Sequence, residues 1–113
     1  MKASLIVTIV RKGWGTTVLE ASVKAGARGG TVIGGRGSGI HEQGKLFGMP
    51  IEPEKEVVLT LVPEPSSECI LNAVVAAANL SKEGNGIAFV VPVDRVVGAA
   101  HFSPPSPTDP FTP

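Results

Sequence analysis

The chain contains no tyrosine, a single cysteine and a single tryptophan among its 113 residues. With Cys69 as its one thiol, the chain cannot form an internal disulfide, and it fits a reducing compartment. An excess of charge of one sign is also missing, because ten basic side chains balance ten acidic ones. This balance argues against a nucleic-acid partner, which usually meets a basic stripe, and against attraction to an anionic membrane surface.

Long apolar runs are absent as well. The first run, 5–10, ends at Arg11 and Lys12, so it is too short to cross a membrane and lacks a small-residue cleavage site. We therefore expect a cytoplasmic protein without direct membrane insertion. Hydrophobic residues still make up 42% of the chain and charged residues 18%, which is enough for the packed core of one domain.

Hydrophobic patterns predict four strands and two helices in the chain. Runs of β-branched residues indicate strands at 4–10, 31–33, 57–62 and 87–93. Apolar residues at helical spacing indicate one helix from Trp14 to Ala25, which Gly26 ends. A second helix is expected to end at Ala78 and to have Ser66 or Ser67 as its N-cap.

The order strand, helix, strand, strand, helix, strand defines an α+β fold. Two βαβ halves with right-handed crossovers predict the ferredoxin-like βαββαβ arrangement, a four-stranded antiparallel sheet with both helices on one face. Strand 57–62 is apolar at consecutive positions instead of alternating, so its second face also needs a cover. No further element is available for this, and self-association is the simplest expectation.

The connection 38–54 between the second and third strands has no clear period and is far longer than a compact hairpin. Long loops in small domains usually carry function, so we interpret it as a partner-contacting arm, with a tolerated insertion as the alternative. At the other end, residues 103–113 hold five prolines. We expect a domain of residues 1–102 followed by a mobile, proline-rich tail.

Several short motifs occur in one order along the chain. They are Gly29-Gly30-Thr31-Val32, Gly37-Ser38-Gly39, the long loop, Lys55, and Gly84-Asn85-Gly86 ahead of Phe89-Val90. In this order and spacing, over about residues 1–102, the chain resembles a divergent member of the PII signal-transduction family, the nitrogen regulatory proteins P-II. The resemblance implies a ferredoxin-like homotrimer that acts as a signalling regulator and not as an enzyme.

The resemblance also implies a nucleotide-binding site in the clefts between subunits. Loop 38–54 corresponds to the family's T-loop, which contacts a target such as a transporter or an enzyme, and 80–86 to its B-loop. Glycines suit such a site because they allow close backbone approach, and free N–H groups can form an anion nest. The residues that the resemblance assigns to an adenine nucleotide are Ile9, Thr31, Gly37, Ser38, Gly39, Lys55, Gly84, Asn85 and Gly86.

The chain departs from the family at cationic positions. Ile87 stands where the family has a lysine, and Gly98 and Ala100 stand where it has two arginines. Losing three cation contacts of about 1–3 kcal/mol each weakens ATP binding roughly a thousandfold or more. We therefore do not expect tight binding of MgATP. The alternatives are a nucleotide with fewer phosphates such as AMP or ADP, a different small molecule, or no ligand at all, and Arg36 and Lys55 could supply charge at the two ends of the loop.

The loop itself also differs from the family pattern. It is shorter than in the family, it lacks the tyrosine that could be modified, and His41 replaces a glutamine that helps to hold Mg²⁺ and 2-oxoglutarate. Met49, Pro50 and Ile51 form an apolar cluster that is expected to contact the target, or alternatively the neighbouring subunit.

An alternative from another class is a CutA-like trimer of similar architecture that binds metal or has a structural role. Its candidate ligands are His41 and His101, but one histidine beside a carboxylate makes a poor site, and we expect no metal. Segment 39–46 resembles a phosphate loop, except that Leu46 stands where a hydroxyl should hold Mg²⁺.

The remaining conspicuous side chains have ordinary interpretations. We expect Cys69 to be a semi-buried cysteine and Trp14 to lie in the core or at an interface. The alternating acids Glu54 and Glu56, with Glu52, are expected to form a solvated entrance to the third strand. No acid–base or nucleophile constellation is visible, which agrees with a protein that is not an enzyme.

Overall fold

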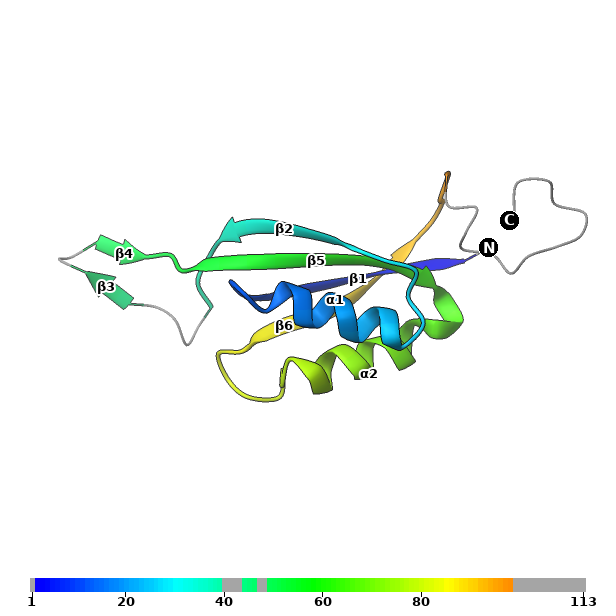
Figure 1. Ribbon diagram of the computed structural model, residues 1–113. Coiled ribbons are helices and arrows are strands. Elements are labelled where there is room, and N and C mark those ends of the chain that lie inside the picture. The colour runs from blue at the N-terminus through cyan, green and yellow to red at the C-terminus, as the bar shows by residue number, and fades with distance from the viewer. Residues whose placement is uncertain (1, 40–43, 47–48, 99–113) are drawn as a thin grey trace, which may run out of the picture.

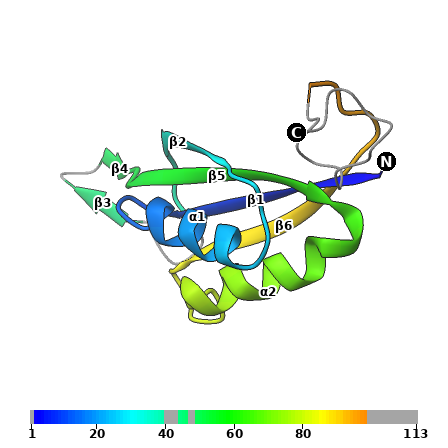
Figure 2. The ribbon, with the colours of Figure 1, turned by 45° about the vertical axis from the view of Figure 1, so that its right-hand side comes forward.

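The computed structural model describes residues 2–39, 44–46 and 49–98, with side chains outside 44–51. Within this part, four antiparallel strands form a sheet in the order β2-β5-β1-β6, and two α-helices cover one of its faces (Figures 1 and 2). The predicted ferredoxin-like fold is therefore confirmed. The sheet strands are β1 (Ala3–Arg11), β2 (Thr31–Arg36), β5 (Glu54–Pro63) and β6 (Gly86–Val93).

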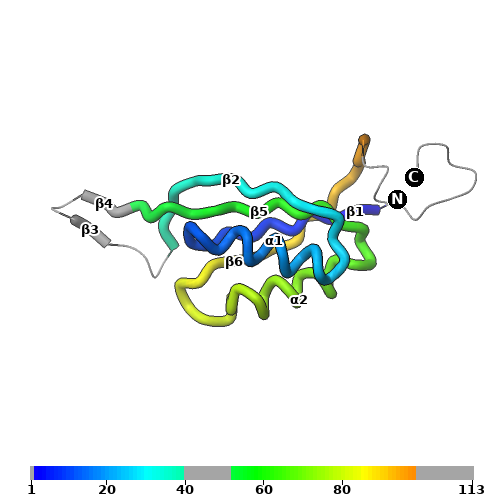
Figure 3. The backbone as a smooth tube through the Cα atoms, in the orientation of Figure 1, coloured from blue at the N-terminus to red at the C-terminus, as the bar shows by residue number. Residues whose placement is uncertain are grey.

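Each helix lies between two strands along the chain (Figure 3). Helix α1 (Gly15–Lys24) connects β1 to β2, and helix α2 (Ser67–Ala77) connects β5 to β6 after a 3₁₀ turn, η2 (Glu64–Ser66). Alternate residues of the two central strands face these helices and are buried. The buried apolar side chains between the helices and the sheet include Ile6, Val10, Val18, Val58, Val62, Ile70 and Val74.

No helix of the described residues lies over the opposite face of the sheet (Figures 1 and 2). Its residues form three cross-strand rows centred on β1, and every member of these rows is apolar. The rows are Leu61-Leu5-Val91, Leu59-Val7-Phe89 and Val57-Ile9-Ile87. We call this surface the open face. Phe89 is 41% exposed and Ile87 55% exposed, so the sequence-based prediction of an uncovered apolar face is confirmed.

The long connection contains regular structure that the sequence pattern did not indicate. Strands β3 (Gly44–Leu46) and β4 (Met49–Ile51) pair as an antiparallel hairpin, which extends past the end of the main sheet (Figure 1). The prediction of a loop without secondary structure is wrong here, because three-residue strands are too short to display a period. His41, His101 and the tail 103–113 lie outside the described residues.

The start of α2 also differs from the prediction. Ser66 makes no side-chain cap hydrogen bond, and the hydroxyl of Ser67 donates to the carbonyl of Glu64 at 2.8 Å. The physical reason is that the 3₁₀ turn runs directly into the helix, so Ser66 already has helical dihedral angles and cannot act as an N-cap. Cys69 is exposed, not semi-buried, because it precedes Ile70 on the helix and is rotated away from the buried stripe.

Candidate functional site

An open cavity of about 520 Å³ lies at the end of the sheet that carries the hairpin. Its floor is one cross-strand row of the open face, in which Ile9 pairs with Val57 on one side and with Ile87 on the other. Alternation along the strands brings these three side chains to the same face. The cavity floor is thus apolar and continuous with the rest of the open face.

One wall of the cavity is the chain that leaves β2. Gly35, Arg36, Gly37, Ser38 and Gly39 line it. The backbone N–H of Gly37 donates to the carbonyl of Pro53 at 3.1 Å, which ties the start of the long connection to the residue just before β5. A Cβ on Gly37 would meet no atom within 4 Å, so this wall presents bare backbone to the cavity.

The second wall is the turn that precedes β6, and it is held by a network of hydrogen bonds. The side-chain amide of Asn85 donates to the carbonyl of Asn79 at 3.0 Å, and Arg11 Nε donates to the carbonyl of Gly84 at 3.0 Å. Gly86 has φ +143°, and a Cβ there would collide with the carbonyl oxygen of Ile9. Gly84 and Gly86 line the cavity, and only glycine fits the second position.

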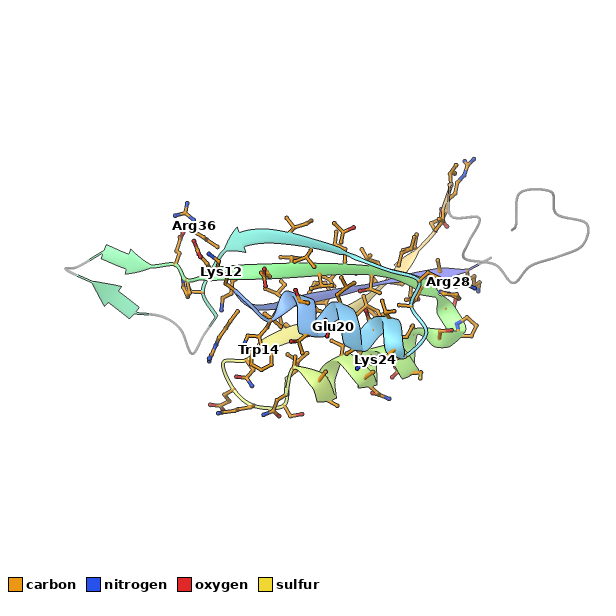
Figure 4. All side chains as sticks on the ribbon, in the orientation of Figure 1. Lys12, Trp14, Glu20, Lys24, Arg28 and Arg36 are labelled. Carbon is orange, nitrogen blue, oxygen red and sulfur yellow. The ribbon has the colours of Figure 1, made fainter. Side chains whose placement is uncertain are left out.

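Among the described residues, the charged ones that line the cavity are two cations, Arg36 and Lys55. Lys55 is only 9% exposed. Nearby, Lys12 Nζ pairs with Glu54 Oε2 at 2.8 Å at the same end of the sheet (Figure 4). This hydrogen-bonded contact raises the pKa of Lys12 and lowers the pKa of Glu54, so the Glu54 carboxylate is already matched by a cation.

Glu56 is not the solvated acid that the sequence pattern predicted. Its Oε1 accepts hydrogen bonds from the backbone N–H groups of Gly13 at 2.8 Å and Gly15 at 2.9 Å. These are amides at the start of α1, where the N-cap residue Trp14 makes no side-chain cap bond. Trp14 itself is 46% exposed, so it does not belong to the core of the protomer.

The structure brings most of the expected site residues together around the cavity. The expected residues that line it are Ile9, Gly37, Ser38, Gly39, Lys55, Gly84 and Gly86. Asn85 is outside the lining and supports the turn through its bond to Asn79. Thr31 is also outside it, because Thr31 precedes Gly35 by four strand residues, a distance of about 13 Å at about 3.3 Å per residue.

Sequence reasoning missed part of the lining. Val57 was not expected there, and Ile87 was considered only as a lost lysine, yet both belong to the floor. The strand register places them beside Ile9, and a register cannot be obtained from one strand alone. Met49, Pro50 and Ile51 form β4 in the hairpin.

Two other kinds of site were searched for among the described residues. No group of three or more His, Cys, Asp or Glu side chains is placed there to hold a metal ion. The CutA-like alternative therefore depends on His41 and His101, which the described part does not include. No helix in that part is both long and apolar enough to pass through a bilayer.

The fold is that of a ferredoxin-like domain with a cavity at one end of its sheet, and the comparisons with known proteins identify the family. The family model for nitrogen regulatory protein P-II matches residues 3–100, so the chain belongs to the P-II family. PII from Arabidopsis thaliana, in a crystal structure with bound citrate, shares 26% sequence identity with a TM-score of 0.69. The match covers 90% of this chain and 87% of that one. No curated protein matches the sequence.

Proposed function

We propose that this P-II family regulatory protein is a cytoplasmic homotrimer that senses an adenine nucleotide, AMP or ADP before MgATP. The nucleotide binds in the cavity beside the long connection, and the connection then engages a target protein such as a transporter or an enzyme. The observation that carries this proposal is the composition of the cavity. An apolar floor continuous with an uncovered sheet face meets walls of open glycine backbone and two cations, Arg36 and Lys55.

The open face supports the trimer. P-II family proteins are generally trimers that interact with protein targets, and this protomer exposes apolar side chains over three strand rows. Burying such an apolar surface between subunits stabilises the assembly by about 25 cal/mol per Å². Because the cavity floor belongs to the same face, a ligand in the cavity lies against the edge of that interface. Thr31 reaches the ligand only if a neighbouring copy supplies it.

The charge of the cavity supports a ligand with few phosphates. Arg36 and Lys55 are the charged residues that the described part of the chain contributes to its lining, and Ile87 contributes an apolar side chain where a lysine would add a third cation. Each additional phosphate that leaves water without a cation partner costs several kcal/mol. The Arabidopsis PII crystal structure contains citrate, so a neighbour of the same fold accepts a small polyanion.

The hydrogen bond between Gly37 and Pro53 supports coupling from the cavity to the hairpin. It joins the two ends of the connection at the point where Gly37 also lines the cavity. A ligand that contacts the 37–39 backbone therefore orders the base of the hairpin, and ordering a segment on ligand contact is an established switching mode. Met49, Pro50 and Ile51 in β4 are the proposed target contacts, and nitrogen metabolism is the proposed pathway.

The proposal is tested on the full chain by sedimentation and calorimetry. We expect a trimer at micromolar concentration that binds AMP and ADP more tightly than MgATP. Ligands that bind the native state raise the unfolding midpoint, so a thermal-shift series with adenosine, AMP, ADP, ATP and citrate provides a second readout. A monomeric protein, or one that responds to none of these compounds, contradicts the proposal.

The target contact is tested separately. Met49→Asp is expected to abolish recovery of the bound target in a pull-down, while trimer formation and nucleotide binding stay as in the wild type. Glu20→Lys is the matched control, because Glu20 lies on α1, away from the hairpin (Figure 4). Equal recovery of the target by Met49→Asp and the wild type would remove β4 from the contact.

A further inference from the structure

Arg11 is a cation at the cavity that neither the sequence motifs nor the cavity lining identified. It is the last residue of β1 and stands opposite Lys55 of β5 in the strand register. Ile9, two residues earlier on the same strand, forms the floor of the cavity. Because strand residues alternate between faces, Arg11 leaves the sheet on the same side as Ile9, next to the cavity.

The guanidinium group of Arg11 lies directly against the glycine turn. Its Nε donates to the carbonyl of Gly84 at 3.0 Å, and a Cβ built on Gly84 would lie 3.1 Å from its Nη2. Gly84 has φ +84° and lines the cavity. A side chain at this position would have to displace the guanidinium, so the absence of a Cβ is what allows the close contact.

Arg11 also retains hydrogen-bonding capacity. A guanidinium has five N–H donors in a planar fork, and the bond from Nε to the carbonyl of Gly84 uses one of them. The two acids nearest in sequence to its register partner are engaged elsewhere, Glu54 with Lys12 and Glu56 with the start of α1.

We propose that Arg11 binds the phosphate of the ligand from the 84–86 side of the cavity, while its Nε bond holds the turn in place. This inference rests on the proposed function and makes it more specific. With Ile87 unable to supply a cation after the turn, the charge comes instead from the end of β1. The ligand class that fits is a nucleoside monophosphate, whose one phosphate would be bound by Arg11 together with the lining cations Lys55 and Arg36.

The test compares AMP with adenosine, which differ only in the phosphate. Calorimetry on the full-length trimer should show that Arg11→Ala weakens AMP binding by about ten- to a hundredfold, as expected for a lost charge-assisted hydrogen bond. Adenosine affinity should stay within about threefold. Arg11→Lys should fall in between, since an ammonium group keeps the charge but not the planar fork.

Arg28→Ala is the matched control. It also removes one exposed arginine, but at the opposite end of the sheet (Figure 4), and it should bind AMP as the wild type does. Circular dichroism and sedimentation verify that each variant folds and assembles.

The possible failures are distinguishable. Unchanged AMP affinity in Arg11→Ala overturns the inference, and so does an equal loss for AMP and adenosine, which indicates that Arg11 only supports the turn. A wild-type protein that binds none of the adenine compounds refutes the proposed function instead.

Discussion

Replacing Glu56 by alanine tests whether a strand residue caps the first helix. Helix α1 has no side-chain cap at Trp14 and no acidic residue in its first turn. The Glu56 carboxylate from β5 takes over this role by accepting the N–H groups of Gly13 and Gly15. The contact is close, because a Cβ on Gly15 would lie 2.9 Å from Glu56 Oε1. Glu56→Ala therefore leaves the start of the helix without an acceptor.

The expected loss follows from two hydrogen bonds to one charged group. Bonds to charged partners contribute about 1.5–3 kcal/mol each, but the one to Gly13 is exposed and is worth less than the partly buried one to Gly15. Loss of a helix N-cap costs about 0.5–2 kcal/mol in proteins. We expect Glu56→Ala to lower the free energy of unfolding by about 2 kcal/mol, a sizeable part of the typical 5–15 kcal/mol.

Urea denaturation measures this loss, with Trp14 fluorescence and circular dichroism as probes. With a slope of about 2 kcal/mol per molar urea, the midpoint should fall by about 1 M without a change of slope. All samples need the same subunit concentration, because association adds to apparent stability. Glu54→Gln is the matched control, since it removes only the exposed pair with Lys12 and should change the midpoint much less. Equal midpoints for Glu56→Ala and Glu54→Gln would refute the capping role.

Three further substitutions test the packing. Gly86→Ala should destabilise the protein by about 2–5 kcal/mol in urea denaturation, because the left-handed φ and the collision with a β1 carbonyl act together; a loss below about 0.5 kcal/mol contradicts this. Thr60→Val should stabilise it by about 1 kcal/mol, because the hydroxyl of Thr60 is fully buried without a hydrogen-bond partner in the described structure; a large destabilisation would indicate a hidden partner. Phe89→Asp should convert the proposed trimer to monomers in sedimentation, whereas Val97→Asp, 82% exposed after the last strand, should not; a Phe89→Asp trimer would place the interface elsewhere.

The fold was largely predictable because its core repeats simple periods. Alternate burial along β1 and β5, and a stripe of Ile70 and Val74 on α2, produce the patterns from which strands and helices are identified. The ends of elements were less predictable. β5 begins at Glu54, three residues before the predicted strand, because its pairing with Arg11, Lys12 and Arg36 depends on partners that a single segment does not reveal.

The residues of the candidate site also fall into those that the sequence predicts and those that it does not. Gly37, Lys55 and Gly84 could be identified from their order along the chain, because the motifs are contiguous. Arg11 and Ile87 could not, since their positions depend on how β1 pairs with both of its neighbours. The cap by Glu56 was missed for a related reason. Its hydrogen-bond donors, the backbone N–H groups of Gly13 and Gly15, lie about forty residues earlier at the start of α1, and only the folded structure brings them to Glu56.

The glycines around the cavity carry different information about function. Gly86 is required by the fold itself, because any side chain would strike β1, so its presence follows from packing alone. Gly37 is different, since a Cβ there would meet no atom within 4 Å and its φ is not in the left-handed region. Neither packing nor backbone strain explains glycine at this wall of the cavity. What glycine does provide at Gly37 is a cavity wall without a side chain in the lining that also holds Lys55, so a ligand can approach the backbone closely. The case for a ligand therefore depends more on Gly37, which the packing does not require, than on Gly86, which it does.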